Sequence, residues 1–309
     1  MIVSTRNAGL GDNLLAAASA WLYAQRTGRA LAICWFHARY VRDARDNAFT
    51  HLFDIPEELA GVPVIHARRV DHLSAFLLSF WSYLFPWPDV VEIARRALTA
   101  RGGPRLFPRM VTTHEKRLQR EMTAVYTTAD LPGRLVIASA CYSGVAATRP
   151  FYDALRLQPR LARQVEEFAA RHFHGRTVIG AHIRYYDPAL PFSHHTAYWT
   201  NPEQALAQCV EMIAAAMRQT GAAHPLLFLA TDSQRVHDHI HRHVDHVVSW
   251  PKPFGASGAR ELHQEIPVET AEASVIEMFL LARCQLLFRY PPDSWFSHYA
   301  SLSVPMFGN

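Results

Sequence analysis

The sequence predicts an α/β protein built from two Rossmann-like domains, each with a mostly parallel sheet, facing a cleft. Short apolar runs, typical of strands buried on both faces, alternate with amphipathic helical patterns. The alternation starts again at Thr177, after breaks at Arg149-Pro150 and Gln158-Pro159. We therefore expect an N-terminal domain over 1–155 and a C-terminal domain over 156–309.

The strands are expected where Val, Ile, Leu and Phe cluster in short runs. In the first domain these runs are Ile2–Thr5, Leu31–Trp35, Val62–His66 and Leu135–Ala140. In the second they are Thr177–Ile183, Leu226–Ala230, Val247–Trp250 and Leu286–Tyr290. Helical spacing of apolar residues predicts the helices Asp12–Thr27 (with Gly28 as C-cap), Pro159–His172, Pro202–Thr220, Ser233–His243 and Thr270–Cys284.

The charge of the chain favours a small anionic ligand. The 309 residues are 50% apolar and 19% charged, with a formal net charge of +4 and a pI near 9.0. The Arg residues are scattered, which argues against a nucleic-acid partner. A modest positive excess suits a nucleotide diphosphate.

The sequence indicates a cytoplasmic protein. Met1–Arg6 lacks the pattern of a signal peptide, and the longest apolar stretch, Leu73–Trp87, is too short to span a bilayer. This stretch is rich in aromatic residues, which pack in a core, stack on sugars or contact a membrane surface peripherally. Four cysteines are expected to be free buried thiols: Cys34, Cys141, Cys209 and Cys284.

The first candidate site motif follows the first strand and opens a helix. Gly9 and Gly11 let the backbone approach a ligand, and the helix N-terminus offers N–H groups to an anion. The alternative is a tight turn in which Asp12 or Asn13 caps the helix.

The second motif ends a strand of the second domain. His182 and Arg184, spaced by two, leave the same face of the strand at its carboxyl end, where ligands of such sheets bind. Arg184 has the fork geometry to hold a phosphate. The alternative is a structural salt bridge between Arg184 and Asp187.

Two further motifs join a strand to a helix. Thr231, Asp232 and Ser233 follow one strand, and Ser294 follows another. Helix capping explains both motifs without a ligand, whereas their place at strand ends is compatible with phosphate binding.

A histidine cluster stands on and after the helix that begins at Ser233. It comprises His237, His239, His241, His243 and His246. Histidines four residues apart share a helix face and can bind zinc. No third ligand is indicated by spacing, so we expect an exposed polar helix and no metal.

These residues resemble those of the α1,6-fucosyltransferase family, which includes NodZ-type nodulation fucosyltransferases and the animal enzyme that fucosylates the N-glycan core. The matching pieces run through most of the chain. They are Gly9–Asp12, Thr27–Ile33, Gly61–Ile65, Val178–Arg184, His195–Trp199, Thr231–Ser233, Leu280–Cys284 and Arg289–Ser294 with Tyr299.

The resemblance implies a GT-B-like fold, a GDP-fucose donor bound mainly by the second domain, inversion at the anomeric carbon and no metal. In this comparison Arg184 resembles the essential arginine on the donor β-phosphate, and His182 resembles a histidine near the guanine or ribose. Glu277 falls at an acidic nucleoside ligand, and Ser294 at a phosphate-contacting hydroxyl. Tyr185 departs from the animal enzymes, which have a second arginine there.

We therefore predict fucose transfer from a GDP-sugar donor to an oligosaccharide acceptor, such as one containing GlcNAc, with Arg184 and Asp187 as catalytic residues. Alternatives for the general base are His194, His195 and Glu265. The predicted donor-binding residues are Gly9, Gly11, Asp12, Asn13, His182, Arg184, Thr231, Asp232, Glu277 and Ser294. Another GDP-sugar, a surface-polysaccharide acceptor and a nucleotide-sugar binding protein without turnover remain open alternatives.

Overall fold

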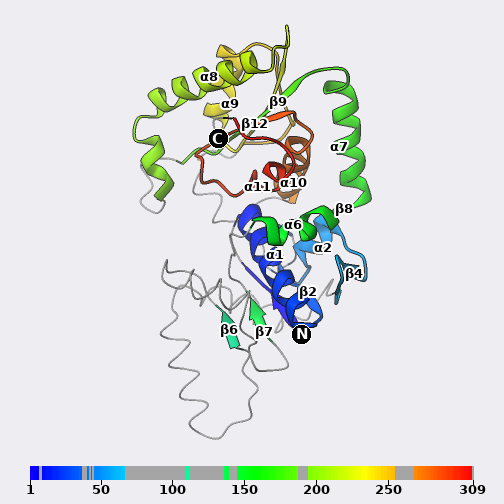
Figure 1. Cartoon of the computed structure of the whole chain (residues 1–309). Coiled ribbons are helices and arrows are strands. Elements are labelled where there is room, and N and C mark those ends of the chain that lie inside the picture. The colour runs from blue at the N-terminus through cyan, green and yellow to red at the C-terminus, as the bar shows by residue number, and fades with distance from the viewer. Residues whose placement is uncertain are drawn as a thin grey trace, which may run out of the picture. The chain divides into compact units, whose positions relative to one another are not determined.

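The computed structural model describes residues 1–6, 9–36, 40, 41, 43, 45–66, 109–111, 136–138, 145–186, 194–254 and 268–307. The chain divides into two compact units, Met1–Gln158 and Pro159–Asn309. Each unit contains a four-stranded parallel sheet with helices (Figure 1). The predicted α/β class is therefore confirmed. The aromatic stretch Leu73–Trp87, Cys141, Asp187 and Glu265 lie outside the described residues.

The sheet of the first unit has the strand order β2-β1-β7-β6. Its strands are β1 (Ile2–Ser4), β2 (Leu31–Ile33), β6 (Arg109–Val111) and β7 (Val136–Ala138). Helix α1 (Leu10–Thr27) connects β1 to β2 and ends where Gly28 adopts a left-handed conformation with φ of 62°. Only glycine takes up this conformation without strain, so the predicted C-cap is confirmed. Strand β6 was not predicted.

The predicted strand Val62–His66 is confirmed only in part. Val62 and Pro63 form β5, which pairs antiparallel with β4 (Glu58–Leu59) in a hairpin. Ala60 and Gly61, with φ of 48° and 82°, form the turn, and positive φ at both positions matches the twist of a two-residue hairpin. After the hairpin the chain reaches the sheet, where Val64 forms a parallel bridge with Leu31 of β2 and the Ile65 N–H donates to the Leu31 carbonyl at 2.8 Å.

The remaining elements of this unit are short. They are α2 (Ala48–Leu52), β3 (Phe53–Asp54), α6 (Val145–Ala154) and β8 (Arg156–Leu157). Strands β3 and β8 pair antiparallel, which ties a segment near residue 53 to one near residue 157.

The sheet of the second unit has the order β11-β10-β9-β12. Its strands are β9 (Val178–Ile183), β10 (Leu226–Thr231), β11 (Val247–Ser249) and β12 (Leu286–Tyr290). Its helices are α7 (Pro159–His172), the 3₁₀ helix η1 (His194–Trp199), α8 (Pro202–Gln219), α9 (Gln234–His243), α10 (Val268–Leu281) and α11 (His298–Ser301). All four predicted strands are present, with bounds that differ from the predicted ones by at most one residue.

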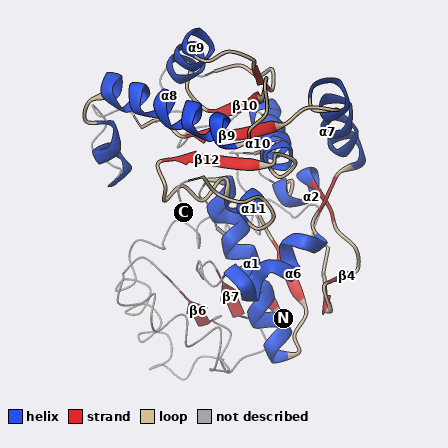
Figure 2. Ribbon diagram, turned by 45° about the horizontal axis from the view of Figure 1, so that its top comes forward, coloured by secondary structure: helices blue, strands red, loops and turns tan. Residues whose placement is uncertain are grey.

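The two faces of this sheet have different coverings. Ile179, Ala181 and Ile183 of β9 pack in a core with residues of α8 and α9 (Figure 2). Gly180 faces the other side, where a Cβ would lie 2.9 Å from Leu281 at the end of α10. Because alternate residues of a strand point to opposite faces, His182 lies on the same face as Gly180.

Three of the four cysteines confirm the predicted free buried thiols: Cys34, Cys209 and Cys284. Burial raises the pKa of Cys34 and of Cys209 to about 12. Within the described ranges, no helix combines the length and apolar character that crossing a membrane requires. The cytoplasmic location stays a prediction.

Candidate functional site

The carboxyl edge of the β9–β10–β12 sheet gathers charged side chains. The register pairs His182 of β9 with Ala230 of β10 and with Arg289 of β12. Arg184 and Asp232 follow β9 and β10 at the same edge. Residues in register on parallel strands share a face, so this edge presents its charges on the α10 side.

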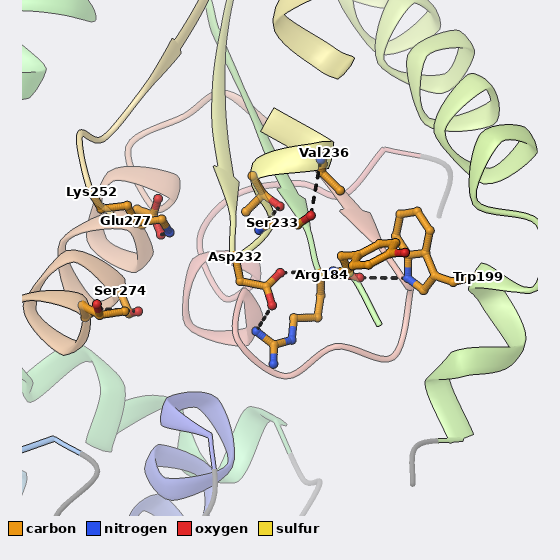
Figure 3. Close-up of polar contacts among 11 residues, drawn as sticks. Arg184, Trp199, Asp232, Ser233, Val236, Lys252, Ser274 and Glu277 are labelled. Carbon is orange, nitrogen blue, oxygen red and sulfur yellow. Dashed lines mark hydrogen bonds and ion pairs between the residues drawn. The ribbon is translucent and has the colours of Figure 1, made fainter. Parts of the chain in front are cut away.

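Arg184 is held on several sides (Figure 3). Its N–H donates to the Tyr290 carbonyl at 2.8 Å, and its own carbonyl accepts from the Trp199 indole N–H at 3.0 Å. Its guanidinium forms an ion pair with Asp232 and lies 5.3 Å from the centre of the Tyr186 ring. The side chain is 17% exposed. A guanidinium fixed in this way presents its remaining N–H groups in a defined direction.

Asp232 acts on Arg184 and its neighbour. One carboxylate oxygen accepts from the Tyr185 N–H at 3.1 Å, and the other faces Arg184. Helix α9 is capped instead by Ser233, whose hydroxyl accepts from the Val236 N–H at 3.4 Å. The capping alternative therefore applies to Ser233, and Asp232 positions Arg184.

His182 is a buried imidazole, 4% exposed. Its Nδ1 lies 3.2 Å from the Ser297 hydroxyl, and its ring lies 4.7 Å from that of Phe296. Burial, together with Arg184 and other nearby cations, lowers the pKa of His182 well below its usual value. The imidazole is therefore neutral near pH 7, and Nε2 makes no hydrogen bond within the described part of the chain.

Lys252 and Glu277 form a second ion pair, with the ammonium 2.5 Å from the carboxylate. Their side chains are only 7% and 3% exposed. Burial raises the pKa of Glu277 to about 7, against the opposing effect of Lys252. Asp232 also raises this pKa, which places Glu277 within electrostatic reach of the Arg184 pair. Glu277 is thus poised between its carboxylate and protonated forms.

A family model described as Nodulation protein Z (NodZ) matches residues 1–307. This chain belongs to the NodZ family. Nodulation protein Z of Sinorhizobium fredii is 29% identical over 312 residues, which cover 98% of this chain and 91% of that protein.

Solved NodZ structures agree with this placement. Fucosyltransferase NodZ from Bradyrhizobium gives a TM-score of 0.69 at 28% identity, covering 99% of this chain and 94% of that one. NodZ alpha-1,6-fucosyltransferase soaked with GDP-fucose gives 0.68 at 27% identity, covering 99% and 93%. The predicted GT-B-like fold class is thereby confirmed.

The predicted donor residues of the first unit lie at the carboxyl end of β1. Gly9 precedes α1 without a side-chain cap, and the Asn13 N–H donates to the Gly9 carbonyl at 2.9 Å. Asn13 is buried, whereas Gly9 is exposed and Gly11 and Asp12 are half-buried. The other predicted donor residues belong to the second unit.

Within the second unit, the structure brings His182, Arg184, Asp232 and Glu277 together. Ser294 is 6% exposed, and its carbonyl accepts from Arg289 at 3.2 Å. The Thr231 hydroxyl accepts from the Ser233 N–H at 3.3 Å, so it supports the turn before α9. Whether these residues bind a donor stays a prediction. Asp187 is not described, and the alternatives His194 and His195 fall in η1.

Three residues of this edge had no role assigned from the sequence. Lys252 follows β11 and pairs with Glu277, Trp199 ends η1 and holds the Arg184 carbonyl, and Arg289 stands on β12. Arg289 carried a signal, because an arginine one residue before the end of an otherwise apolar strand lies where ligands bind. Lys252 and Trp199 are placed by tertiary contacts that no local pattern indicates.

The histidine cluster is an exposed polar helix, as predicted. Helix α9 buries only Val236 and Ile240. The rings of His237 and His241 lie 4.2 Å apart, and those of His239 and His243 lie 4.3 Å apart. In the described ranges, no three His, Cys, Asp or Glu side chains are grouped to hold a metal ion.

Proposed function

We propose that this chain is an inverting fucosyltransferase that transfers fucose from GDP-fucose to a hydroxyl of an oligosaccharide, such as one containing GlcNAc. Two observations support this: membership of the NodZ family and similarity to NodZ alpha-1,6-fucosyltransferase structures, one soaked with GDP-fucose and one crystallised with GDP. The geometric observation that carries it is the guanidinium of Arg184, fixed by Asp232 at the carboxyl edge of the sheet.

The reaction is a direct displacement at C1 of fucose. The acceptor oxygen forms the new bond on one face while the bond to the diphosphate breaks on the other. Negative charge grows on the departing GDP, and Arg184 stabilises this charge. The neutral His182 offers Nε2 as a hydrogen-bonding group to the nucleotide. Asp187 accepts the acceptor proton, because it follows Arg184 closely along the chain.

The two units divide the substrates between them. The second unit, which holds Arg184, His182 and Glu277, binds the GDP-sugar donor. The first unit takes the acceptor. No metal takes part, since charge neutralisation of the diphosphate falls to arginine.

A nucleotide screen followed by a transfer assay tests this function. GDP and GDP-fucose should raise the melting temperature more than UDP, CMP or ADP, because a ligand that binds the folded state stabilises it by mass action. GDP-fucose should then label a chitin oligosaccharide, with a rate unchanged by EDTA, whereas GDP-mannose and UDP-sugars should not. Binding of GDP-fucose without transfer to any glycan would indicate a binding protein instead.

A further inference from the structure

Arg289 is a cation at the carboxyl end of β12, beside β9. Its register partner is His182, and neighbouring strands lie about 4.8 Å apart. Leu286 and Phe288 belong to the core beneath α8 and α9. Because side chains alternate along a strand, Arg289 points to the opposite face, the one that carries His182.

Within the described residues, Arg289 forms no ion pair with a carboxylate, unlike two other arginines of this unit. Arg184 and Arg283 each form an ion pair with a carboxylate. Arg289 donates from NH1 to the Ser294 carbonyl at 3.2 Å, and its buried Nε finds no acceptor among the described residues. Burial lowers the pKa of Arg289, an effect that nearby Asp293 only opposes. A half-buried charge that forms no ion pair is costly unless an anion joins it.

Three cations converge on His182. Burial is the largest cause of the lowered pKa of the imidazole, and the next causes, in decreasing order, are the charges of Arg184, Arg289 and Lys252. Arg184 and Lys252 each form an ion pair with a carboxylate, whereas Asp293 acts on Arg289 without forming an ion pair with it among the described residues. The charge of Arg289 is therefore the one of the three that can pair with an anionic ligand. A guanidinium offers a planar fork that matches two phosphate oxygens.

The residue after Arg184 carries no charge in this chain, because Tyr185 stands where the animal enzymes have a second arginine. Tyr185 is 8% exposed, and its ring lies 4.9 Å from that of Trp199 in the core beneath α8 and α9. We propose that Arg289 is a second phosphate-binding guanidinium, which holds the diphosphate of a nucleoside diphosphate together with Arg184. This inference rests on the proposed function, because both concern the same site.

Calorimetric titration of the Arg289→Gln variant tests the inference. GDP affinity should fall about 10- to 100-fold, the range for losing charge-assisted hydrogen bonds. Inorganic pyrophosphate should lose affinity in the same direction, whereas guanosine, which has no phosphate, should bind within about twofold of wild type. The matched control Arg283→Gln, which removes a surface ion pair of the same unit, should leave all three affinities unchanged.

Two results would overturn the inference: unchanged GDP affinity, or an equal loss of GDP and guanosine, which would mean that Arg289 only holds the Ser294 carbonyl. Should the Gln variant fail to fold, Arg289→Lys carries the test, with a loss for GDP of about threefold or more and none for guanosine. Wild-type protein that binds pyrophosphate but no guanine nucleotide would contradict the proposed function, while pyrophosphate affinities still decide the role of Arg289. Wild-type protein that binds neither would overturn both.

Discussion

Neighbouring residues fix the position of the Arg184 guanidinium. Asp232 takes part of its charge, yet the same contact fixes the guanidinium and leaves it 17% exposed. Preorganised donors stabilise developing charge without reorganising during the reaction. At the scale of single residues, the site is therefore a set of held cations, in which Asp232 positions Arg184 and the buried pair Lys252–Glu277 lies within electrostatic reach.

The Glu277 carboxyl should make donor binding depend on pH. Its pKa is raised to about 7, so it is a carboxylate above that pH and protonated below it. If the carboxylate accepts hydrogen bonds from the nucleoside, GDP affinity should fall up to about tenfold for each pH unit below 7. Lys252 lowers this pKa, so Lys252→Met should move the midpoint to higher pH.

GDP dissociation constants measured from pH 5.5 to 9 for wild type and for Lys252→Met check this prediction. Arg283→Met, which removes a more exposed cation, is the control and should leave the midpoint in place. If the pH midpoint of GDP affinity in Lys252→Met were equal to or lower than that of wild type, Glu277 would not govern GDP binding.

At the scale of elements, close packing of β9 against α10 fixes the edge. A Cβ on Gly180 would lie 2.9 Å from Leu281 Cδ2 and 3.0 Å from Cys284 Sγ. Gly180→Val should therefore cost about 1–3 kcal/mol of unfolding free energy through overpacking. Melting temperature and urea unfolding measure this cost. The control is Ala223→Val on the exposed loop before β10, which should change the unfolding free energy by less than about 0.5 kcal/mol. If Gly180→Val cost no more unfolding free energy than Ala223→Val, β9 would not be closely packed against α10.

The helices and the buried strands of the second unit could be predicted because each follows from local pattern. Val178–Ile183 is apolar along almost its whole length, as a strand covered on both faces must be. Val62–His66 is also mostly apolar, yet Ala60 and Gly61 form a hairpin turn that pairs its start with Glu58–Leu59, and Val64 alone bridges to Leu31 of β2. Apolar composition alone does not choose the pairing partner.

In the candidate site, too, some residues could be predicted from local pattern and others could not. His182 and Arg184 were predictable because their spacing and strand end are visible in the sequence. The pairing of Arg184 with Asp232 is set by strand register, which brings positions 48 residues apart in number side by side. Lys252 reaches Glu277 only after the sheet and α10 are assembled, so no local spacing indicates it.

At the scale of the whole molecule, three cationic side chains gather at the sheet edge of the second unit. The +4 charge is modest, and at the sheet edge Arg184, Lys252 and Arg289 meet the two ion-paired carboxylates of Asp232 and Glu277. That balance leaves a small positive charge, which suits a diphosphate bound and released in every cycle. The NodZ family relationship covers residues 1–307, so both units belong to the proposed enzyme.

The most direct measurement is the turnover of GDP-fucose by Arg184→Ala, with the Arg184→Ala/Asp232→Ala double variant to remove the carboxylate left unpaired. Both variants should lose kcat by about 10²–10³ and lose GDP affinity by a smaller factor, because charge on the diphosphate is greatest in the transition state. Arg283→Ala should keep wild-type turnover. A folded Arg184→Ala variant that retains kcat within about threefold of wild type would contradict the account.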